Sequence, residues 1–259
     1  RGIMPGDCVS VIAHTCWQWT ALDMAIMSIG ALTVPVYETN SPAQVEMIFN
    51  DSQVRMAFAE NDAQRDKIES VRERCPDLGD VYVIDRGAIE TLREYGRGVS
   101  DAEFYERERA VGGDDLATIV YTSGSTGVPK GIELTHGSFV FITYSGVQSM
   151  PDIAMKPNRR LLLFLPLAHV FARYMQFFCF AGNVTLGLSS NLKTILADFS
   201  AFKPTFILAV PRIFEKIYNA ASQKAGRGLK GRIFADAAVV AREWSKAQQS
   251  GDGIPAALN

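Results

Sequence analysis

Short apolar runs alternate along the chain with longer segments in which apolar residues recur at helical spacing. The runs are about five residues long and almost wholly apolar, which is typical of strands buried on both faces. The pattern predicts strands at residues 9–13, 34–37, 55–59, 81–84, 116–121, 161–165, 184–188 and 205–210. Helical segments between strands imply crossover connections, so the expected fold is α/β, with layered, mainly parallel sheets flanked by helices.

Local signals set the expected helix starts. Ser41 precedes Pro42 and is followed at the third position by Gln44, which is the pattern of a capping box. Thr15 and Asn61 are expected to cap two more helices. Helices are predicted at 16–31, 42–50, 62–74, from about 136, from about 168, and at 192–202, 211–225 and 229–249. Charges and glycines over 85–114 predict a surface connection with one or two short helices.

Composition narrows the classes of partner. The chain has 259 residues and a formal net charge of −2. A dedicated nucleic-acid binder usually carries a basic excess, so no nucleic acid is expected as a partner. The four cysteines are scattered and no histidine stands at metal-ligand spacing from them, so a zinc site is not expected. Reduced, mostly buried thiols are typical of a cytoplasmic protein.

The most apolar region, residues 161–188, is not expected to cross a membrane. It contains Pro166, which interrupts a helix, and polar side chains along its length, namely His169, Arg173, Gln176 and Asn183. Such groups are costly inside a lipid bilayer. A buried strand, helix and strand account for the region better. Peripheral contact with a membrane surface and the oligomeric state stay open.

A loop rich in glycine and hydroxyl groups directly follows the strand predicted at 116–121. Its residues are Thr122, Ser123, Gly124, Ser125, Thr126, Gly127, Val128, Pro129 and Lys130. Glycines let the backbone come close to an anion, successive N–H groups can cradle it, and a lysine adds positive charge. The position at a strand end favours a phosphate-binding loop. The alternative is a flexible surface loop of ordinary composition.

Two other nucleotide-binding patterns do not apply. Pro129 stands where the pattern G-x-x-x-x-G-K, counted from Gly124, requires glycine, so the loop is not a Walker motif. Residues 226–231 match G-x-G-x-x-G, but they follow a predicted helix, whereas a dinucleotide site needs strand, turn and helix in that order. This second segment is predicted to be a turn between helices.

The segment from Tyr121 to Gly131 resembles the signature loop of the adenylate-forming superfamily, which includes acyl-CoA synthetases, luciferases and the adenylation domains of peptide synthetases. Ser125 stands where many members have threonine, and serine keeps the hydroxyl group of that position. Residues 165–173 and 132–137 are also similar to these ligases. Residues 210–218 and the opening of the chain resemble bacterial long-chain fatty acyl-CoA synthetases in particular.

This resemblance implies a two-step reaction. A carboxylate attacks the α-phosphate of ATP to give acyl-AMP and pyrophosphate, and coenzyme A then displaces AMP to form a thioester. The cofactors implied are ATP, Mg²⁺ and coenzyme A, and the acid implied is a long-chain fatty acid. The resemblance assigns phosphate binding to the loop residues Thr122, Ser123, Gly124, Ser125, Thr126, Gly127 and Lys130. Ser125 or Thr126 would also contribute to the Mg²⁺ site.

The resemblance also places His169 near the approach of the acyl group and coenzyme A. Arg173 is four residues further along, and on a helix the two side chains would share one face. Both are therefore expected to act in catalysis. The alternative is a buried histidine with one hydrogen bond and an arginine on the rim of a helix.

The chain is expected to be an excerpt, an incomplete N-terminal adenylation domain over 1–259 without the small C-terminal domain. The later family motifs (a metal-binding glutamate, a ribose-binding aspartate, a hinge and a catalytic lysine) are not in it, so the excerpt alone is expected to be inactive. Three alternatives stay open: a non-catalytic nucleotide-binding relative, a ligase for another carboxylic acid, and a phosphotransferase that releases ADP.

Overall fold

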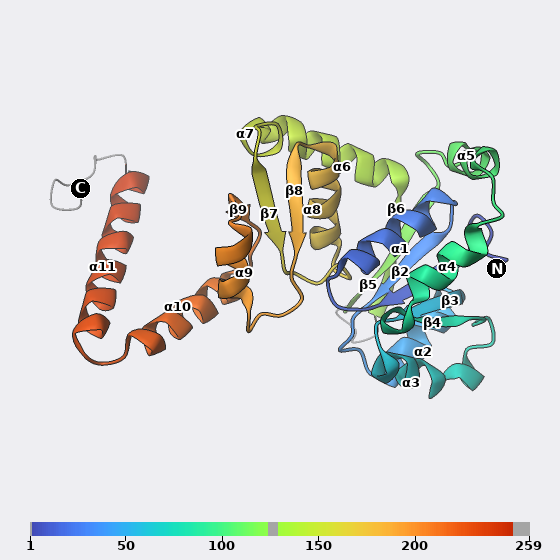
Figure 1. Ribbon diagram of the computed structural model, residues 1–259, viewed down its shortest axis with the longest axis horizontal. Helices are drawn as coiled ribbons and strands as arrows, with labels where there is room; N and C mark the ends of the chain where they lie inside the picture. The colour runs from blue at the N-terminus through green and yellow to red at the C-terminus, as the bar shows by residue number, and fades with distance from the viewer. Residues whose placement is uncertain (1, 124–128, 251–259) are drawn as a thin grey trace. The chain divides into compact units, whose positions relative to one another are not determined.

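The computed structural model describes residues 2–123 and 129–250, and it has the α/β architecture expected from the sequence (Figure 1). The chain divides into two compact units, Arg1–Leu208 and Ala209–Asn259. The first unit holds a six-stranded sheet in the order β4-β3-β1-β2-β5-β6. Its strands are β1 (Cys8–Ile12), β2 (Leu32–Val36), β3 (Val54–Ala59), β4 (Val81–Val83), β5 (Leu116–Ser123) and β6 (Pro129–Thr135). All pairs are parallel except β5 with β6, so the prediction of a mainly parallel sheet is confirmed.

Helices cover both faces of this sheet because the crossover from β1 to β2 and the crossover from β2 to β3 run in opposite directions along it. Helix α1 (Trp17–Ser28) leads to β2 on one side, and α2 (Pro42–Asp51) leads back across β1 to β3. Right-handed crossovers in opposite directions lie on opposite faces. Alternate β1 side chains enter the two cores accordingly: Val9 and Val11 pack with α1, and Ile12 packs with α2.

The capping predictions have different outcomes. Ser41 and Gln44 form the expected capping box at the start of α2, and Asn61 caps α3 (Asp62–Glu69) by accepting a hydrogen bond from the Gln64 amide. The expectation for Thr15 is wrong, because α1 has Cys16 at its N-cap position and no side-chain cap. The Thr15 hydroxyl makes tertiary hydrogen bonds instead.

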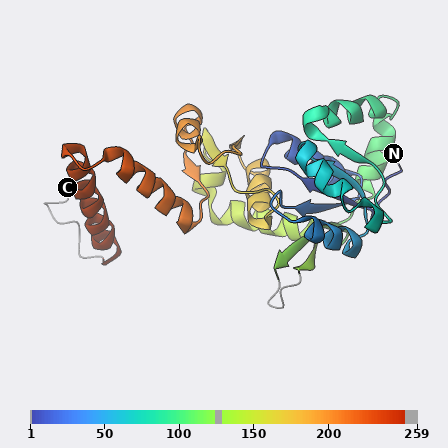
Figure 2. The same cartoon turned by 90° about the horizontal axis from the view of Figure 1, so that it is seen from below.

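A second sheet lies beside the first, with α1 and α8 between the two (Figures 1 and 2). It has the order β8-β7-β9 and is parallel throughout. Its strands are β7 (Arg159–Leu163), β8 (Val184–Leu188) and β9 (Phe206–Ile207), and the helices around it are α6 (His136–Ser149), α7 (Pro151–Ala154), α8 (Val170–Ala181) and α9 (Ile195–Phe202). Leu161 and Leu163 of β7 share one apolar core with Trp19 of α1 and Phe178 of α8. The two sheets are thus joined through packed helices.

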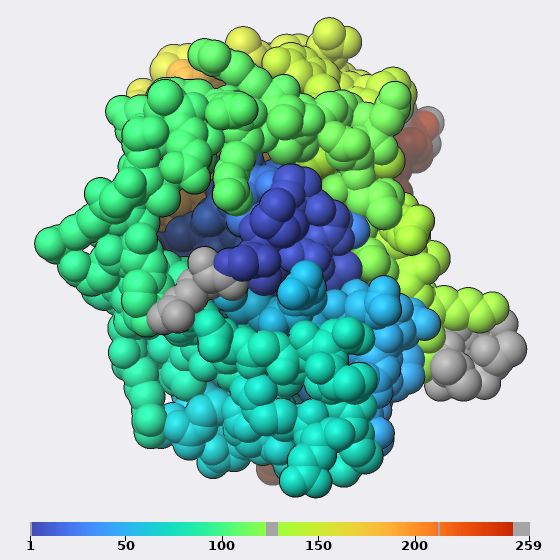
Figure 3. Space-filling model, turned by 90° about the vertical axis from the view of Figure 1, so that its right-hand side faces the viewer, coloured from blue at the N-terminus to red at the C-terminus, as the bar shows by residue number. Residues whose placement is uncertain are grey.

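The surface connection predicted over 85–114 contains two short helices, α4 (Ala88–Gly96) and α5 (Asp101–Arg109), as expected. Single 3₁₀ turns cover Arg72–Arg74 and Ile84–Arg86. Figure 3 shows the start of the chain, in dark blue, at the surface between the green segment that holds α5 and the cyan to teal segment that follows β3.

The second unit contains a helical pair, α10 (Pro211–Ala225) and α11 (Leu229–Ser250). The Tyr218 and Phe234 rings pack against each other with centroids 5.4 Å apart. Residues 226–228 of the G-x-G-x-x-G segment form the turn between these helices, with Gly226 at a positive φ of 71°. Residues 229–231 already belong to α11, so the predicted turn is confirmed for the first half of the segment. Within the described parts of the chain, no helix combines the length and apolar character that crossing a bilayer requires.

Candidate functional site

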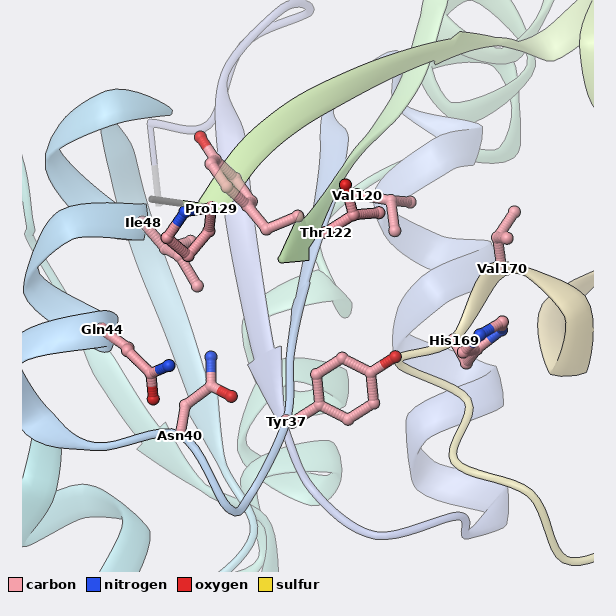
Figure 4. A pocket seen from close by; sticks show the side chains of 10 residues that line it. Tyr37, Asn40, Gln44, Ile48, Val120, Thr122, Pro129, His169 and Val170 are labelled. Carbon is pink, nitrogen blue, oxygen red and sulfur yellow. The ribbon is translucent and has the colours of Figure 1, made fainter. Parts of the chain in front are cut away.

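A pocket of about 440 Å³ lies where β2 and β5 end and α8 begins (Figure 4). Ligands of open α/β sheets bind outside the carboxyl ends of the strands, which is where this pocket stands. The lining residues come from five elements or their flanks, and they are Tyr37, Asn40, Gln44, Ile48, Val120, Tyr121, Thr122, Pro129, His169 and Val170. The pocket therefore collects side chains from the first sheet and from the helix that covers the second.

The ends of the glycine- and hydroxyl-rich loop border this pocket. Thr122 and Pro129 line it, and the antiparallel register pairs Thr122 with Lys130 and Ser123 with Pro129. Opposite residues of such a pair present their side chains to the same face, so Lys130, which is exposed, emerges beside Thr122. Gly124, Ser125, Thr126 and Gly127, which include both predicted Mg²⁺ ligands, lie outside the described residues.

Tyr121 anchors β5 to helix α2. Its hydroxyl donates a hydrogen bond of 2.6 Å to the Asp51 Oδ2 atom at the end of α2. Burial and this hydrogen bond raise the pKa of Tyr121, so it stays a neutral phenol. Gly131 of β6 pairs with Tyr121, and a methyl group at Gly131 would lie 2.8 Å from Ile119 Cγ2. Close packing thus holds the strand that leads into the loop.

The other polar groups of the pocket can donate and accept hydrogen bonds. The Tyr37 hydroxyl points towards the His169 side of the pocket in Figure 4, and burial followed by the charge of Glu38 raises the pKa of Tyr37. Asn40 and Thr122 add an amide and a hydroxyl. Sequence reasoning missed Tyr37 and Asn40. Their place just after a parallel strand is the signal that could have identified them.

The described lining fits phosphate and ribose oxygens better than it fits a bare metal ion. None of the described lining residues carries a carboxylate. Mg²⁺ is usually held by one or two carboxylates, waters and substrate phosphates. Among the residues that the structure describes, no group of three histidine, cysteine or acidic side chains is arranged to hold a metal. The hydroxyls of the loop and the phosphates themselves would have to supply the ligands.

His169 lies in the pocket and caps helix α8. Its Nδ1 atom accepts a hydrogen bond of 3.2 Å from the Phe171 amide. A neutral ring that accepts at Nδ1 carries its hydrogen at Nε2. The pocket therefore receives a histidine whose ring orientation is set by the helix that follows it.

Arg173 is not part of this pocket, which corrects the expectation that it shares a site with His169. The Arg173 side chain is fully buried, and its Nη2 atom lies 2.6 Å from Asp23 Oδ1. Helix α8 begins only at Val170, so His169 stands before the helix and Arg173 is on the face that packs into the core. The guanidinium is directed towards α1 and β5.

An apolar groove of about 430 Å³ adjoins the pocket and shares Val170 with it. It runs between α6 and α8 and is lined by Leu134, Ser138, Phe139, Ile142, Val170, Phe171 and Tyr174. Ser138 and Tyr174 are the lining residues with a side-chain hydroxyl. A polar pocket beside an apolar groove can accommodate a ligand with a polar head and an apolar body.

A histidine and two carboxylates meet at the same edge of the sheet, beyond β1, β2 and β3. The His14 Nδ1 atom lies 2.6 Å from Glu60 Oε2, and its Nε2 atom lies 3.7 Å from Glu38 Oε1. Burial lowers the pKa of His14, but the hydrogen bond to Glu60 and the charges of both carboxylates outweigh burial and raise it. This cluster ties together the loops that follow three strands.

Known proteins are similar to this chain in sequence and in fold. The sequence is 41% identical over 257 residues to the long-chain-fatty-acid–CoA ligase FadD15 of Mycobacterium tuberculosis, covering 98% of this chain and 43% of that protein. The peroxisomal long chain acyl-CoA synthetase 7 of Arabidopsis thaliana is 28% identical over 249 residues, covering 90% of this chain and 35% of that one. The chain thus spans less than half the length of these relatives.

Solved structures share the fold. A complex of VinN with L-aspartate matches with a TM-score of 0.70 and 22% identity, covering 86% of this chain and 54% of that one. A Mycobacterium tuberculosis fatty acyl CoA synthetase matches with a TM-score of 0.65 and 23% identity, covering 83% and 41%. The family model described as AMP-binding enzyme matches residues 1–256, which is nearly the whole chain. The protein therefore belongs to the AMP-binding enzyme family.

Proposed function

We propose that this chain is the first part of the large N-terminal domain of a longer AMP-forming ligase. The complete enzyme activates a carboxylic acid as an acyl-adenylate at the expense of ATP, and then transfers the acyl group to coenzyme A. The observation that carries the proposal is the meeting of Thr122 and Pro129, the two ends of the loop, with His169 around one pocket. Membership of the family supports it.

The chemistry explains why such a loop is needed. An anionic carboxylate must approach a polyanion, and the leaving pyrophosphate gathers further negative charge. Fixed N–H dipoles and a lysine offset this repulsion without reorganisation during the reaction. Phosphate binding is assigned to Thr122, Ser123, Gly124, Ser125, Thr126, Gly127 and Lys130. Mg²⁺, held with the help of Ser125 or Thr126, would neutralise charge on the transferred phosphate.

His169 stands on the acyl side of the pocket, opposite the loop. Its Nε2 hydrogen, freed by the use of Nδ1 in capping, can donate to an oxygen of the acyl group or the adenylate. This assigns His169 to substrate binding in the adenylation step. Arg173 acts through the core rather than on the substrate.

A long-chain fatty acid is the proposed substrate. The apolar groove between α6 and α8 continues from the pocket, and apolar surface removed from water there favours binding by about 25 cal/mol per Å². The name of the 41% identical relative supports the same class of acid. A ligase for another carboxylic acid is the second candidate, to be separated by a panel of acids. We place the enzyme in the cytoplasm, where it is either free or held at a membrane surface.

The test is ATP–pyrophosphate exchange by the full-length enzyme with acids of graded chain length, followed by a thioester assay with coenzyme A. Release of AMP and pyrophosphate supports the ligase. Release of ADP would indicate a phosphotransferase. ATP binding without exchange would indicate a non-catalytic relative, and the 259-residue chain alone is expected to show no exchange.

A matched pair of variants tests the loop. Lys130→Met should lower the exchange rate by about 100-fold, because it removes a positive charge from the phosphates. Lys193→Met removes an exposed charge from a segment away from the pocket and should leave the rate unchanged. Equal rates for the two variants would contradict the assignment of Lys130.

A further inference from the structure

A buried guanidinium joins α8 directly to β5, the strand that leads into the loop. Arg173 Nη1 donates a hydrogen bond of 2.8 Å to the Thr118 hydroxyl, which in turn donates to the Thr33 carbonyl of β2. Arg173 also forms a two-pronged ion pair with Asp23 of α1, with distances of 3.1 Å from Nε and 2.6 Å from Nη2. The side chains of Arg173, Asp23 and Thr118 are wholly inaccessible to solvent.

The same guanidinium lies over two aromatic rings. The Arg173 Cζ atom lies 5.6 Å from the ring centroid of Trp19 on α1 and 5.1 Å from that of Phe139 on α6. Arginine can stack on aromatic faces while its N–H groups bind in the plane. One side chain therefore contacts α1, α6 and β5 from its position on α8.

Further polar contacts fasten α8 and the segment before it to α1 and its N-terminal flank. The Thr20 hydroxyl donates a hydrogen bond of 2.6 Å to Gln176, one turn beyond Arg173. The Thr15 hydroxyl donates to the Leu165 carbonyl at 2.7 Å and accepts from the Leu167 amide at 3.2 Å. Of these links, the bond to Thr118 is the one that reaches β5, four residues before Thr122.

We propose that Asp23, Arg173 and Thr118 are positioning residues that set the distance between the two walls of the pocket. One wall is Val120–Thr122 of β5, and the other is His169 at the start of α8. Arg173 lies one turn after His169, and its amide donates to the His169 carbonyl at 3.3 Å. The inference rests on the proposed function, because the two walls are assigned to the phosphates and to the acyl group.

Stability alone does not account well for this arrangement. Buried ion pairs often contribute little net stability compared with apolar residues of the same volume. The space around the Arg173 guanidinium is otherwise apolar, because Trp19, Phe139 and Met27 lie against it. The directed hydrogen bonds among Asp23, Arg173 and Thr118 instead favour one placement of α8 relative to β5. Such placement matters because misplacing reacting groups by about 1 Å can cost about 100-fold in rate.

A double-mutant cycle in the full-length enzyme tests this. Thr118→Val keeps the side-chain shape and the ion pair but removes the hydroxyl that receives Arg173, whereas Thr118→Ser keeps the hydroxyl and serves as the control. Each is combined with His169→Ala, and kcat for ATP–pyrophosphate exchange is measured well below the melting temperature, together with KM for ATP and for the acid. Should Thr118→Val melt within the assay range, Thr118→Cys takes its place in the cycle, because a thiol keeps the side chain small and is only a weak hydrogen-bond partner.

The expected result is a fall in kcat of about 10-fold for Thr118→Val, with both KM values within about two-fold and activity retained in Thr118→Ser. In the His169→Ala background the same change should cost less than about two-fold, because the group being positioned is gone. The positioning role would be overturned if the losses of kcat from Thr118→Val and His169→Ala multiply in the double variant. It would also be overturned if Thr118→Val changes the melting temperature and leaves kcat unchanged. A full-length wild type that shows no exchange with any acid would overturn the proposed function and this inference with it.

Discussion

His169 Nδ1 and the Phe171 amide nitrogen are 3.2 Å apart, so a pocket histidine also begins the helix that follows it. Asparagine is among the best capping residues, whereas alanine is a poor one. His169→Asn should therefore keep the helix start but lose the ring in the pocket. His169→Ala should lose both.

We expect the free energy of unfolding to fall by about 1 kcal/mol for His169→Ala and by a few tenths for His169→Asn. Exchange activity of the full-length enzyme should fall in both variants. Chemical denaturation and the exchange assay measure the two effects separately. Full activity in His169→Asn would show that the ring serves only as a cap.

Removing one member of the buried ion pair should be far more costly than removing both. Arg173→Met leaves the Asp23 carboxylate buried and unpaired, which should lower the free energy of unfolding by about 3–5 kcal/mol. The double variant Asp23→Leu, Arg173→Met should recover most of that loss. Urea denaturation of the three proteins provides the measurement, and a double variant no more stable than the single one would contradict the prediction.

Two histidines, His14 and His136, give the stability opposite dependences on pH. The pKa of His14 is raised above its ordinary value of 6.5, so the folded state holds this proton more tightly than the unfolded state. The stability that protonated His14 contributes is complete below pH 6.5 and is lost as the pH rises through the raised pKa of the folded state. The difference in free energy of unfolding between wild type and His14→Gln should therefore shrink as the pH increases from about 6 to about 9.

His136 should act in the opposite direction. Its burial lowers its pKa, although Asp115 partly opposes this, and its Nε2 atom is buried without a hydrogen-bond partner among the described residues. The folded state therefore loses stability as the pH falls below 6.5 and the unfolded state takes up a proton. In the His14→Gln variant, the free energy of unfolding should rise between about pH 5 and pH 7. A flat profile in that variant would contradict the assignment to His136.

Tyr121→Phe should loosen the strand that carries the loop. It removes the hydrogen bond to Asp51, and because that carboxylate is exposed we expect a loss of about 1 kcal/mol rather than the larger value for a buried charged pair. Tyr144→Phe, on an exposed tyrosine of α6, is the matched control and should leave stability unchanged. Thermal melting monitored by circular dichroism compares the two, and equal melting temperatures would contradict the anchoring role.

The local structure of this protein follows from short-range signals in its sequence. Five-residue apolar runs gave the strands, and Ser41 with Gln44 gave the start of α2, because pleat, burial and capping depend on neighbours within a few residues. The motif from Thr122 to Lys130 indicated the family, and its ends lie at the predicted strand edge. The loop's own contacts with phosphate stay a prediction.

Tertiary structure decided which polar side chains serve the pocket and which serve the core. Thr15 and Arg173 looked like a helix cap and a site residue, yet each bonds to partners about 150 positions away, at Leu165 and Asp23. Tyr37 joined the pocket only because β2 and β5 are neighbours in the sheet. Sequence periodicity carries no information on such pairings, since they depend on how whole elements pack, and a buried charge must find its partner wherever the fold provides one.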